Sequence, residues 1–304
     1  MNINHFLTLS DWSAATLREL VDSAISDKKN YTAPRSEKQQ GRMLALLFDQ
    51  PSTRTRVSFT AAMARLGGQT ISLTAQDTQI GRGETLADTA RVLSRMVDII
   101  VMRTHEHHNL LELAAHSGVP VINGLTNHSH PCQVLADIMT FEEARGDISG
   151  RKIAWVGDGN NVCQSFMEAA HLFGFHLHVA TPRGREPDET FIMSYGHSPW
   201  VHLGHDPVEA VLGADLVVTD VWVSMGDKSA SQDALKLLMK PYQVNAGLMN
   251  LARSDALFMH CLPVHREEEV TAEVIDGSQS IVWDEAENRL HIQKALLKYL
   301  LSSN

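Results

Sequence analysis

The sequence predicts an α/β protein of two doubly wound parallel-sheet domains, with the functional site in the cleft between them. The chain has 304 residues, which is long enough for two domains. Short β-branched runs alternate with longer amphipathic segments, a pattern typical of parallel sheets that helices cover on both faces. The alternation pauses around residues 146–150, which hold Gly146 and Gly150, and then starts again. We therefore expect a domain boundary at this pause.

The first domain is expected to span residues 1–147. Ser10 is placed as the cap of an opening helix, because apolar residues that share one helical face follow it. Pro51 breaks the strand before it, and Gly67 and Gly68 stop the helix that comes next. We expect helices at 10–28, 53–66, 86–96, 108–116 and 131–145, and strands at 43–48, 70–74, 98–102 and 119–122.

The second domain is expected to span residues 148–287, and it repeats the strand-helix alternation. The last helix, about 288–304, is expected to pack back on the first domain. We expect strands at 152–156, 176–180, 216–219, 257–260 and 280–283, a helix at 161–173, and a closing helix at 288–301. Two such halves would bring strand ends and helix starts together in a cleft.

Composition narrows the functional class. The 36 acidic residues outnumber the 26 basic ones, giving a formal net charge of −10, which argues against a nucleic-acid-binding surface. No apolar run approaches the roughly 18 residues of a membrane span, and the first residues lack the pattern of a secretory signal. The three cysteines form no CxxC pair, as is usual in a reducing cytosol. We expect a cytoplasmic protein without nucleic-acid or membrane partners.

The segment Pro-Ser-Thr-Arg-Thr-Arg at residues 51–56 is the strongest candidate for a binding site. It lies between a buried strand and a helix, and a helix start offers unpaired backbone N–H groups to an anion. Ser52, Thr53 and Thr55 add hydroxyl groups, and Arg54 adds a planar fork suited to phosphate oxygens. The alternative is an ordinary capped helix start with solvated arginines. The chain contains no GxxxxGK[ST] string, which excludes an ATP-type phosphate loop.

A second segment, His130-Pro131-Cys132-Gln133, opens the long helix of the first half. Proline suits a first helical turn, so His130 and Gln133 would point from a helix start, where His130 could donate to a carbonyl oxygen. Arg103 follows a buried strand, and a charge there usually lies at the functional edge of a parallel sheet. The alternatives are a capping histidine and a surface ion pair.

The second half offers weaker signals. Gly157 and Gly159 begin a dinucleotide-like turn, but Val162 stands where a third glycine belongs, and only Arg183 keeps an NADP-binding interpretation open. A tight turn that presents Asn161 is the better interpretation. Asp220 follows a strand and could hold an ammonium group. Cys261 lies at the end of another strand. It could be a nucleophile, a polar contact to an amine, or an inert buried thiol.

The run His105-Glu106-His107-His108 has the residue types of a metal site but not the spacing. It is not an HExxH motif, and it does not place two imidazoles on one helix face. We interpret it as a solvated loop and expect no metal.

Together and in this order, the motifs resemble the aspartate/ornithine carbamoyltransferase superfamily, and within it the ornithine carbamoyltransferase family, over essentially the whole chain. The string Ser-Thr-Arg-Thr-Arg is similar to the carbamoyl-phosphate signature, and residues 130–133 are similar to the second carbamoyl-phosphate segment. Asp220 with Ser224-Met225-Gly226 resembles the ornithine-side loop. His260-Cys261-Leu262-Pro263 and the segment 285–289, Glu-Ala-Glu-Asn-Arg, resemble late motifs of the family.

The resemblance implies a role for each matching residue. Residues 1–147 would bind carbamoyl phosphate and residues 148–287 would bind ornithine. The reacting centre would involve Arg103, His130 and Cys261. Carbamoyl phosphate would meet Ser52, Thr53, Arg54, Thr55, Gln79, Arg103, His130, Pro131, Cys132, Gln133, Cys261, Leu262 and Arg289. Ornithine would meet Asn161, Asp220, Ser224 and Met225.

The resemblance also implies the reaction, which is carbamoyl transfer from carbamoyl phosphate to the δ-amine of L-ornithine, with L-citrulline and phosphate as products. No metal or organic cofactor would be needed. A homotrimer, or a multiple of it, with sites at subunit interfaces would be expected, acting in arginine metabolism and amino-acid biosynthesis. Citrulline synthesis and citrulline breakdown both remain open.

Alternatives to this reaction remain. Other acceptors are N-acetylornithine, N-succinylornithine, putrescine and aspartate, although Asp220 favours an acceptor with an ammonium group. An NADP-dependent oxidoreductase and a non-catalytic binding protein are more distant possibilities.

One departure from the family concerns Asp49 and Gln50, where many ornithine enzymes have an acidic residue followed by lysine. We expect weaker carbamoyl-phosphate binding from the missing lysine rather than lost activity.

Overall fold

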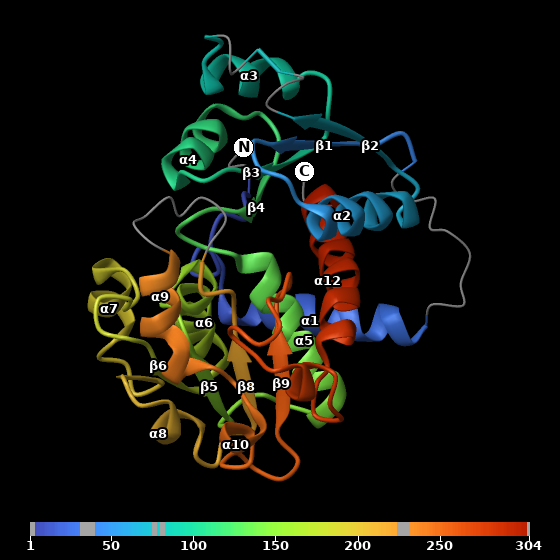
Figure 1. The fold of residues 1–304 in the computed structure, drawn as a ribbon. Coiled ribbons are helices and arrows are strands. Elements are labelled where there is room, and N and C mark those ends of the chain that lie inside the picture. The colour runs from blue at the N-terminus through green and yellow to red at the C-terminus, as the bar shows by residue number, and fades with distance from the viewer. Residues whose placement is uncertain (1–3, 31–39, 75–77, 80–82, 224–231, 303–304) are drawn as a thin grey trace. The chain divides into compact units, whose positions relative to one another are not determined.

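The computed structural model describes residues 4–30, 40–74, 78–79, 83–223 and 232–302 (Figure 1). The chain divides into two compact units, one made of Met1–Met139 with Glu287–Asn304 and the other of Thr140–Ala286. Each unit contains one sheet whose described strand pairs are all parallel, with helices between the strands. The predicted fold class, two parallel-sheet α/β domains, is confirmed.

The first unit is built on a four-stranded sheet. Its strand order is β2-β1-β3-β4. β2 therefore pairs with one side of β1, and β3 followed by β4 extends the sheet on the other side of β1. The elements are α1 (Ala14–Lys29), β1 (Met43–Phe48), α2 (Thr53–Arg65), β2 (Gln69–Thr74), α3 (Leu86–Leu93), β3 (Ile99–Arg103), α4 (His107–His116), β4 (Val121–Leu125) and the beginning of α5 (Pro131–Arg145), joined by most of α12 (Val282–Ser302).

Apolar side chains of the central strands fix this sheet in place. Five of the six residues of β1 are buried, as are all five of β3. Leu47 and Ile100 share one core cluster with Leu110 and Leu113 of α4. The topology reverses between β1 and β3, and in open parallel sheets ligands bind beside the carboxyl ends of the strands at such a point. The segment 51–56 and Arg103 follow or end these two strands.

The second unit is built on a five-stranded sheet of order β7-β6-β5-β8-β9. Its topology reverses between β5 and β8, so the carboxyl ends of these two strands define a second candidate site. The elements are β5 (Lys152–Val156), α6 (Asn161–Phe173), β6 (His176–Ala180), α7 (Glu189–Tyr195), β7 (Val201–Gly204), α8 (Pro207–Val211), β8 (Leu216–Thr219), α9 (Gln232–Met239), the 3₁₀ turn η3 (Lys240–Tyr242), α10 (Ala246–Met249), β9 (Leu257–His260) and α11 (Ala272–Ile275).

Helices cover both faces of the second sheet. On one face Trp155 of β5 packs on Phe166 of α6, with ring centroids 5.9 Å apart. On the other face Ala154 and Val156 join a buried cluster with Val211 of α8. Gly174 ends α6 at φ 69°, a left-handed conformation that glycine adopts without steric cost.

Several predicted boundaries are wrong. The first helix is capped by Ser13 rather than Ser10, because the Ser13 side chain accepts the Thr16 N–H. The strand expected at 280–283 is absent from the described structure: Ser280 forms a single bridge to Phe258, and Val282 already begins α12. A short apolar run does not distinguish a strand from a buried helix start. The edge strand β7 was not expected at all.

The histidine-rich run also differs from its prediction. We expected residues 105–108 to form a loop, but α4 begins at His107, whose Nδ1 lies 2.9 Å from Thr126 Oγ1. Glu106 provides the cap position without a side-chain hydrogen bond. The loop prediction therefore fails from residue 107 onward.

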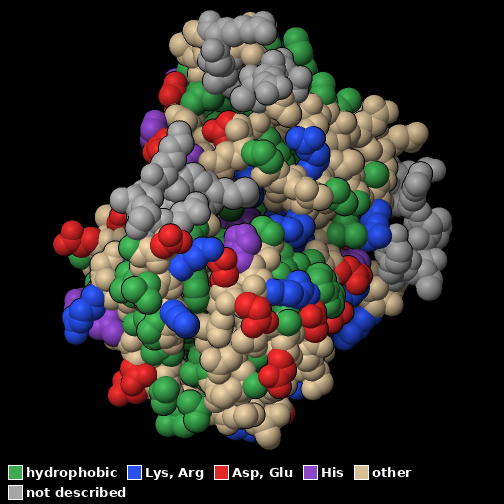
Figure 2. All heavy atoms as spheres, viewed as in Figure 1, with side chains coloured by type: hydrophobic (Ala, Val, Ile, Leu, Met, Phe, Trp, Pro, Cys, Tyr) green, Lys and Arg blue, Asp and Glu red, His purple; other side chains and the backbone are tan. Residues whose placement is uncertain are grey.

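The surface carries both signs of charge. On the face that Figure 2 shows, acidic and basic side chains are interspersed among the described residues. None of the helices described has the length and hydrophobicity needed to span a bilayer.

Candidate active site

The start of α2 has the capped helix-start geometry that an anion-binding site requires. Ser52 is the N-cap residue, and its hydroxyl accepts the backbone N–H of Thr55 at 3.3 Å. Thr53 is exposed, Arg54 is half-buried and Thr55 is buried. The remaining N–H groups of this first turn and the positive end of the helix dipole can receive an anion.

A buried polar network stands beside this helix start. Arg289, only 2% exposed, lies on α12 and donates to Gln133 Oε1 at 2.5 Å and to Thr55 Oγ1 at 3.2 Å. Gln133 in turn donates from Nε2 to Asp137 Oδ1 at 2.8 Å. Three segments distant in the sequence thus meet here, and Asp137 supplies a buried acidic end to the chain of hydrogen bonds. The sequence did not point to Asp137, although its place one turn after Gln133 is a signal that could have found it.

His130 lies among cations. It is 4% exposed, and its pKa is well below 6.5 because burial disfavours the imidazolium and because Arg289, Arg103 and Arg54 oppose a further positive charge. His130 is therefore neutral at physiological pH. Arg103 ends β3 and is 7% exposed. A neutral imidazole among three guanidinium groups can donate to an anionic or carbonyl oxygen without changing the charge of the site.

Neighbouring residues hold this corner together. Pro131 begins α5, as expected. Cys132 is buried, its Sγ lies 3.5 Å from the carbonyl oxygen of Asn123, and burial raises the pKa of its thiol to about 12. The Cys132 thiol is thus a packing group rather than a reactive thiolate.

Asp49 and Gln50, which depart from the family pattern, have different surroundings. Asp49 accepts the Thr104 hydroxyl at 2.5 Å, and its N–H donates to the carbonyl oxygen of Arg103 at 3.1 Å. Asp49 therefore helps to fix the end of β3. Gln50 is half-buried. Gln79 is exposed, and its carbonyl oxygen accepts the N–H of Glu84 at 3.1 Å.

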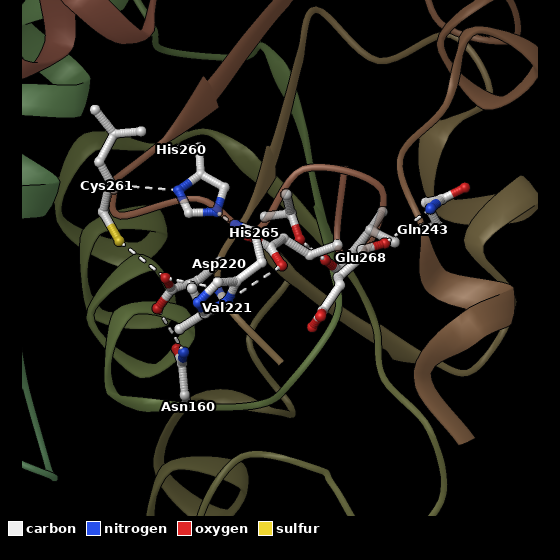
Figure 3. A network of polar contacts seen from close by, with 12 residues as sticks. Asn160, Asp220, Val221, Gln243, His260, Cys261, His265 and Glu268 are labelled. Atoms are coloured by element: carbon white, nitrogen blue, oxygen red, sulfur yellow. Dashed lines mark hydrogen bonds and ion pairs between the residues drawn. The ribbon is translucent and has the colours of Figure 1, made fainter. Parts of the chain in front are cut away.

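The second unit gathers Asp220, Asn160 and Cys261 at the carboxyl ends of β5, β8 and β9 (Figure 3). Asp220 is 8% exposed. Its Oδ2 accepts Asn160 Nδ2 at 2.7 Å, and its Oδ1 accepts the Val221 N–H at 2.7 Å and the Cys261 thiol at 3.0 Å. Three donors thus converge on the carboxylate group of Asp220. Because Cys261 Sγ donates a proton in this arrangement, the sulfur is a thiol that can accept a hydrogen bond.

His260 orients the loop that follows β9. Its Nδ1 accepts the Leu262 N–H at 2.9 Å, so the proton is assigned to Nε2, which lies 3.1 Å from Glu269 Oε1. Glu269 and His260 are fully buried. Leu262 has φ 57°, a conformation uncommon for a residue with a side chain, and its peptide bond to Pro263 is cis. Glu269 could not be predicted from the sequence, because no motif in its neighbourhood indicates that it contacts His260.

The predicted acceptor-side residues divide into two groups. Asn161 is the first residue of α6, whereas its neighbour Asn160 is the N-cap and contacts Asp220. The family resemblance pointed to Asn161 rather than Asn160, although an asparagine directly before a helix is a known capping signal. Ser224 and Met225 lie outside the described residues.

The glycine-rich turn after β5 is explained by packing within the chain. A Cβ atom on Gly159 would lie 2.3 Å from Pro187 N and 2.7 Å from the carbonyl oxygen of Arg185. Arg185 also binds Asp158 through two hydrogen bonds of 2.8 and 2.9 Å. The segment 185–187 therefore occupies the space beside Gly159, which removes the argument for a dinucleotide at this glycine.

Among the residues that the structure describes, two groups of side chains have ligand atoms close enough to hold a metal ion. They are Asp220 with His260 and Cys261, and His265 with Glu268 and Glu269, each with its ligand atoms within 4.8 Å of one another. In the first group both ring nitrogens of His260 have hydrogen-bond partners, and Cys261 donates to Asp220. A metal ion there would have to displace these contacts.

Comparison with known proteins gives consistent matches. The family model described as the carbamoyl-P binding domain of aspartate/ornithine carbamoyltransferase matches residues 4–143, and the model of its Asp/Orn binding domain matches residues 149–300. The ornithine carbamoyltransferase of Nitrobacter winogradskyi is 57% identical over 304 residues, covering 98% of this chain and 97% of that protein. That of Methylococcus capsulatus is 54% identical, with full coverage of both chains.

Solved structures agree with these sequence matches. The ornithine carbamoyltransferase from Pyrococcus furiosus has a TM-score of 0.93 and 48% identity, covering 99% of this chain and 98% of that one. The enzyme from Thermus thermophilus has a TM-score of 0.90 and 40% identity, covering 99% of this chain and all of that one.

Proposed function

The chain belongs to the aspartate/ornithine carbamoyltransferase family, and from this premise we propose that it transfers the carbamoyl group of carbamoyl phosphate to the δ-amine of L-ornithine. The products are L-citrulline and phosphate. Curated relatives with at least 51% identity over almost the whole chain carry the name ornithine carbamoyltransferase, which supports ornithine as the acceptor.

The buried cationic cluster of the first unit is the single observation that carries the proposal. Arg54, Arg103 and Arg289 all act on a neutral His130, and Arg289 is fixed by two hydrogen bonds. Three guanidinium groups and a helix start suit a dianionic phosphate that carries a carbonyl group. Carbamoyl phosphate has both features.

Each member of this cluster has a proposed task. The phosphate is held by the N–H groups of α2 and by the side chains of Ser52, Thr53, Arg54 and Thr55, with Gln79 as a further contact. His130 and Gln133 hold the carbamoyl group, with Pro131 and Cys132 shaping the helix start and Arg289 completing that side. During attack by the amine, negative charge develops on the carbonyl oxygen of carbamoyl phosphate. Arg103, His130 and Thr55 stabilise this charge, and the loss of one such donor raises the activation free energy by about 3 kcal/mol.

The second unit is proposed to bind the acceptor. The carboxylate group of Asp220 suits the ammonium group of an amino acid, with Asn161, Ser224 and Met225 as further contacts. The attacking δ-amine must be neutral, although a free alkylamine has a pKa of about 10. Desolvation of the bound amine, and any cationic group beside it, would favour the neutral form.

Cys261 acts in this proposal as an orienting group and not as a covalent nucleophile. Its proton is donated to Asp220 Oδ1, so the sulfur lone pairs face other partners and can accept an N–H of the amine. Leu262 is proposed as a further contact to carbamoyl phosphate. A thiocarbamate on Cys261 that turned over at the catalytic rate would contradict this role.

The test is citrulline formation from carbamoyl phosphate and L-ornithine, with L-aspartate, N-acetylornithine, N-succinylornithine and putrescine measured in parallel. We expect turnover with ornithine alone. Turnover with an acylated ornithine would show that this compound, and not ornithine, is the acceptor. The absence of turnover with every acceptor would indicate a non-catalytic binding protein. In the active enzyme, Arg54→Ala should raise the KM for carbamoyl phosphate more than that for ornithine.

We further propose a homotrimer, or a multiple of it, with sites at subunit interfaces, working in the cytoplasm in arginine metabolism. Membership of the family supports this assembly and this setting. Light scattering coupled to gel filtration tests the assembly, and a mass of one or two chains would contradict it.

A further inference from the structure

The turn that follows residues 260–263 brings together three side chains that can bind a metal ion. One ligand atom each of His265, Glu268 and Glu269 lies within 4.8 Å of the other two (Figure 3). Two hydrogen bonds close this turn: the Glu268 N–H donates to the carbonyl oxygen of His265 at 3.0 Å, and the His265 N–H donates to Glu269 Oε1 at 2.6 Å. None of the three residues has a task in the proposed carbamoyl transfer.

One buried oxygen of Glu269 faces this group of ligand atoms. The Glu269 side chain is fully buried, and its Oε1 serves both the His265 N–H and His260, whose Nε2 lies 3.1 Å away. Its Oε2 is buried too and has no hydrogen-bond partner among the described residues, and His265 Nδ1 lies 3.9 Å from it. Because a buried carboxylate oxygen without a hydrogen bond is costly, a cation at this position would stabilise it.

The separations suit a small dication. Ligand atoms about 2.0–2.2 Å from a tetrahedral zinc ion lie roughly 3.3–3.6 Å from one another, so His265 Nδ1 and Glu269 Oε2 need to approach by roughly half an ångström. The side chains of His265 and Glu268 are 54% and 30% exposed, which leaves both free to rotate toward the buried oxygen. A water molecule can take the fourth position.

We propose that His265, Glu268 and Glu269 form a binding site for a transition-metal dication, Zn²⁺ foremost. Two carboxylate groups balance the charge of a dication, and an imidazole ligand favours zinc over magnesium and calcium, which take oxygen ligands. The bound ion fixes the turn beside β9, because Glu269 also contacts His260, the last residue of that strand. The site therefore stabilises the second unit and does not depend on the reaction proposed above.

Lys236 of α9 is a neighbouring charge that opposes the ion. Its ammonium group donates to Glu268 Oε1 at 2.5 Å, so it competes with a metal for this carboxylate. Arg266, the other cation of the turn, is directed to Asp276, with a hydrogen bond of 2.7 Å. Lys236→Met removes the competing charge and is expected to tighten zinc binding.

The experiment titrates the full-length protein with Zn²⁺ by calorimetry. A Cys261→Ser parent is used, so that the thiol of the neighbouring group of possible ligands does not contribute. We expect one zinc per chain, and at least about a tenfold loss of affinity in His265→Gln and in Glu268→Gln. His197→Gln, at an exposed histidine of the same unit, is the matched control and should bind as the parent does.

Thermal unfolding gives a readout that is independent of activity. Zinc should raise the Tm of the parent and of Lys236→Met but leave the Tm of His265→Gln unchanged. The proposal is overturned if the parent binds no zinc, or if His265→Gln and Glu268→Gln both bind it as tightly as the parent. If these two variants fail to fold, weaker or unchanged zinc binding by Lys236→Met overturns it.

Discussion

Replacing Arg289 with methionine tests the proposed catalytic role of this residue separately from its structural role. The side chain is 2% exposed and donates to Gln133 Oε1 at 2.5 Å and to Thr55 Oγ1 at 3.2 Å. Hydrogen bonds from a charged donor contribute about 1.5–3 kcal/mol each, so the two lost bonds cost about 3–6 kcal/mol of unfolding free energy. Methionine keeps most of the apolar stem of arginine in place.

Repulsion among the arginines offsets much of this loss. Arg54 and Arg103 act on the same imidazole as Arg289, so three like charges converge. At separations of roughly 8 Å and an effective dielectric constant of about 20, each pair repels by about 2 kcal/mol. Removing Arg289 relieves two pairs, or about 4 kcal/mol. We therefore expect a net change in unfolding free energy of no more than about 2 kcal/mol.

We expect no such compensation in catalysis, because bound carbamoyl phosphate would neutralise the positive charge of the cluster. Loss of a charged donor should lower kcat/KM for carbamoyl phosphate by about 10²–10³-fold. Steady-state citrulline assays and urea titrations measure the two quantities, with Arg91→Met, an exposed arginine paired with Asp88 at 2.9 Å, as the control. The pKa of His130, followed by NMR, should rise in the variant. Activity within threefold of wild type, or an unchanged His130 pKa, would refute the reasoning.

Three further changes test other parts of the molecule. Asp220→Asn removes the charge that three donors stabilise, so the KM for ornithine should rise at least tenfold while that for carbamoyl phosphate stays within twofold in initial-rate assays; the reverse pattern would contradict the acceptor assignment. Burial, reinforced by His128, lowers the pKa of His107 to about 4, and an unfolded histidine titrates near 6.5. The unfolded chain therefore takes up a proton first, and the contribution of His107 to the unfolding free energy should be constant above pH 6.5 and decrease toward pH 4, by less than about 1.4 kcal/mol per pH unit for this half-buried group. Urea titrations at several pH values in a chelator measure this, and a flat profile would contradict it. Gly159→Ala places a Cβ 2.3 Å from backbone and should lower Tm by several degrees, whereas Gly204→Ala, with its nearest contact at 3.7 Å, should be tolerated.

Much of the fold follows from local sequence patterns. The strands β1, β3 and β5 are continuous apolar runs between turn residues, and such runs identify buried parallel strands. The edge strand β7 has only four residues, of which two are exposed, so its pattern is too short and too mixed to predict. The start of α12 was taken for a strand because its first apolar residues carry no periodicity of their own.

The site was predictable where one short segment carries the chemistry. The helix start at Ser52 and the histidine before α5 could be found from neighbouring residues alone. Contacts across the sequence could not. Glu269 meets His260 nine residues away through a loop, and Asp137 matters only because Gln133 links it to Arg289. These pairs depend on tertiary packing, which no local spacing encodes.

Because the three thiols have different surroundings, covalent reagents should modify one cysteine of this protein selectively. Cys132 and Cys163 are buried, and burial raises the pKa of both thiols, so electrophiles and oxidants reach neither readily. Cys261 is the accessible one, next to Asp220. A fluorophore or spin label attached there would report on the surroundings of Asp220, the proposed acceptor site, without replacement of the other cysteines, and oxidation of a purified sample would begin at the same sulfur.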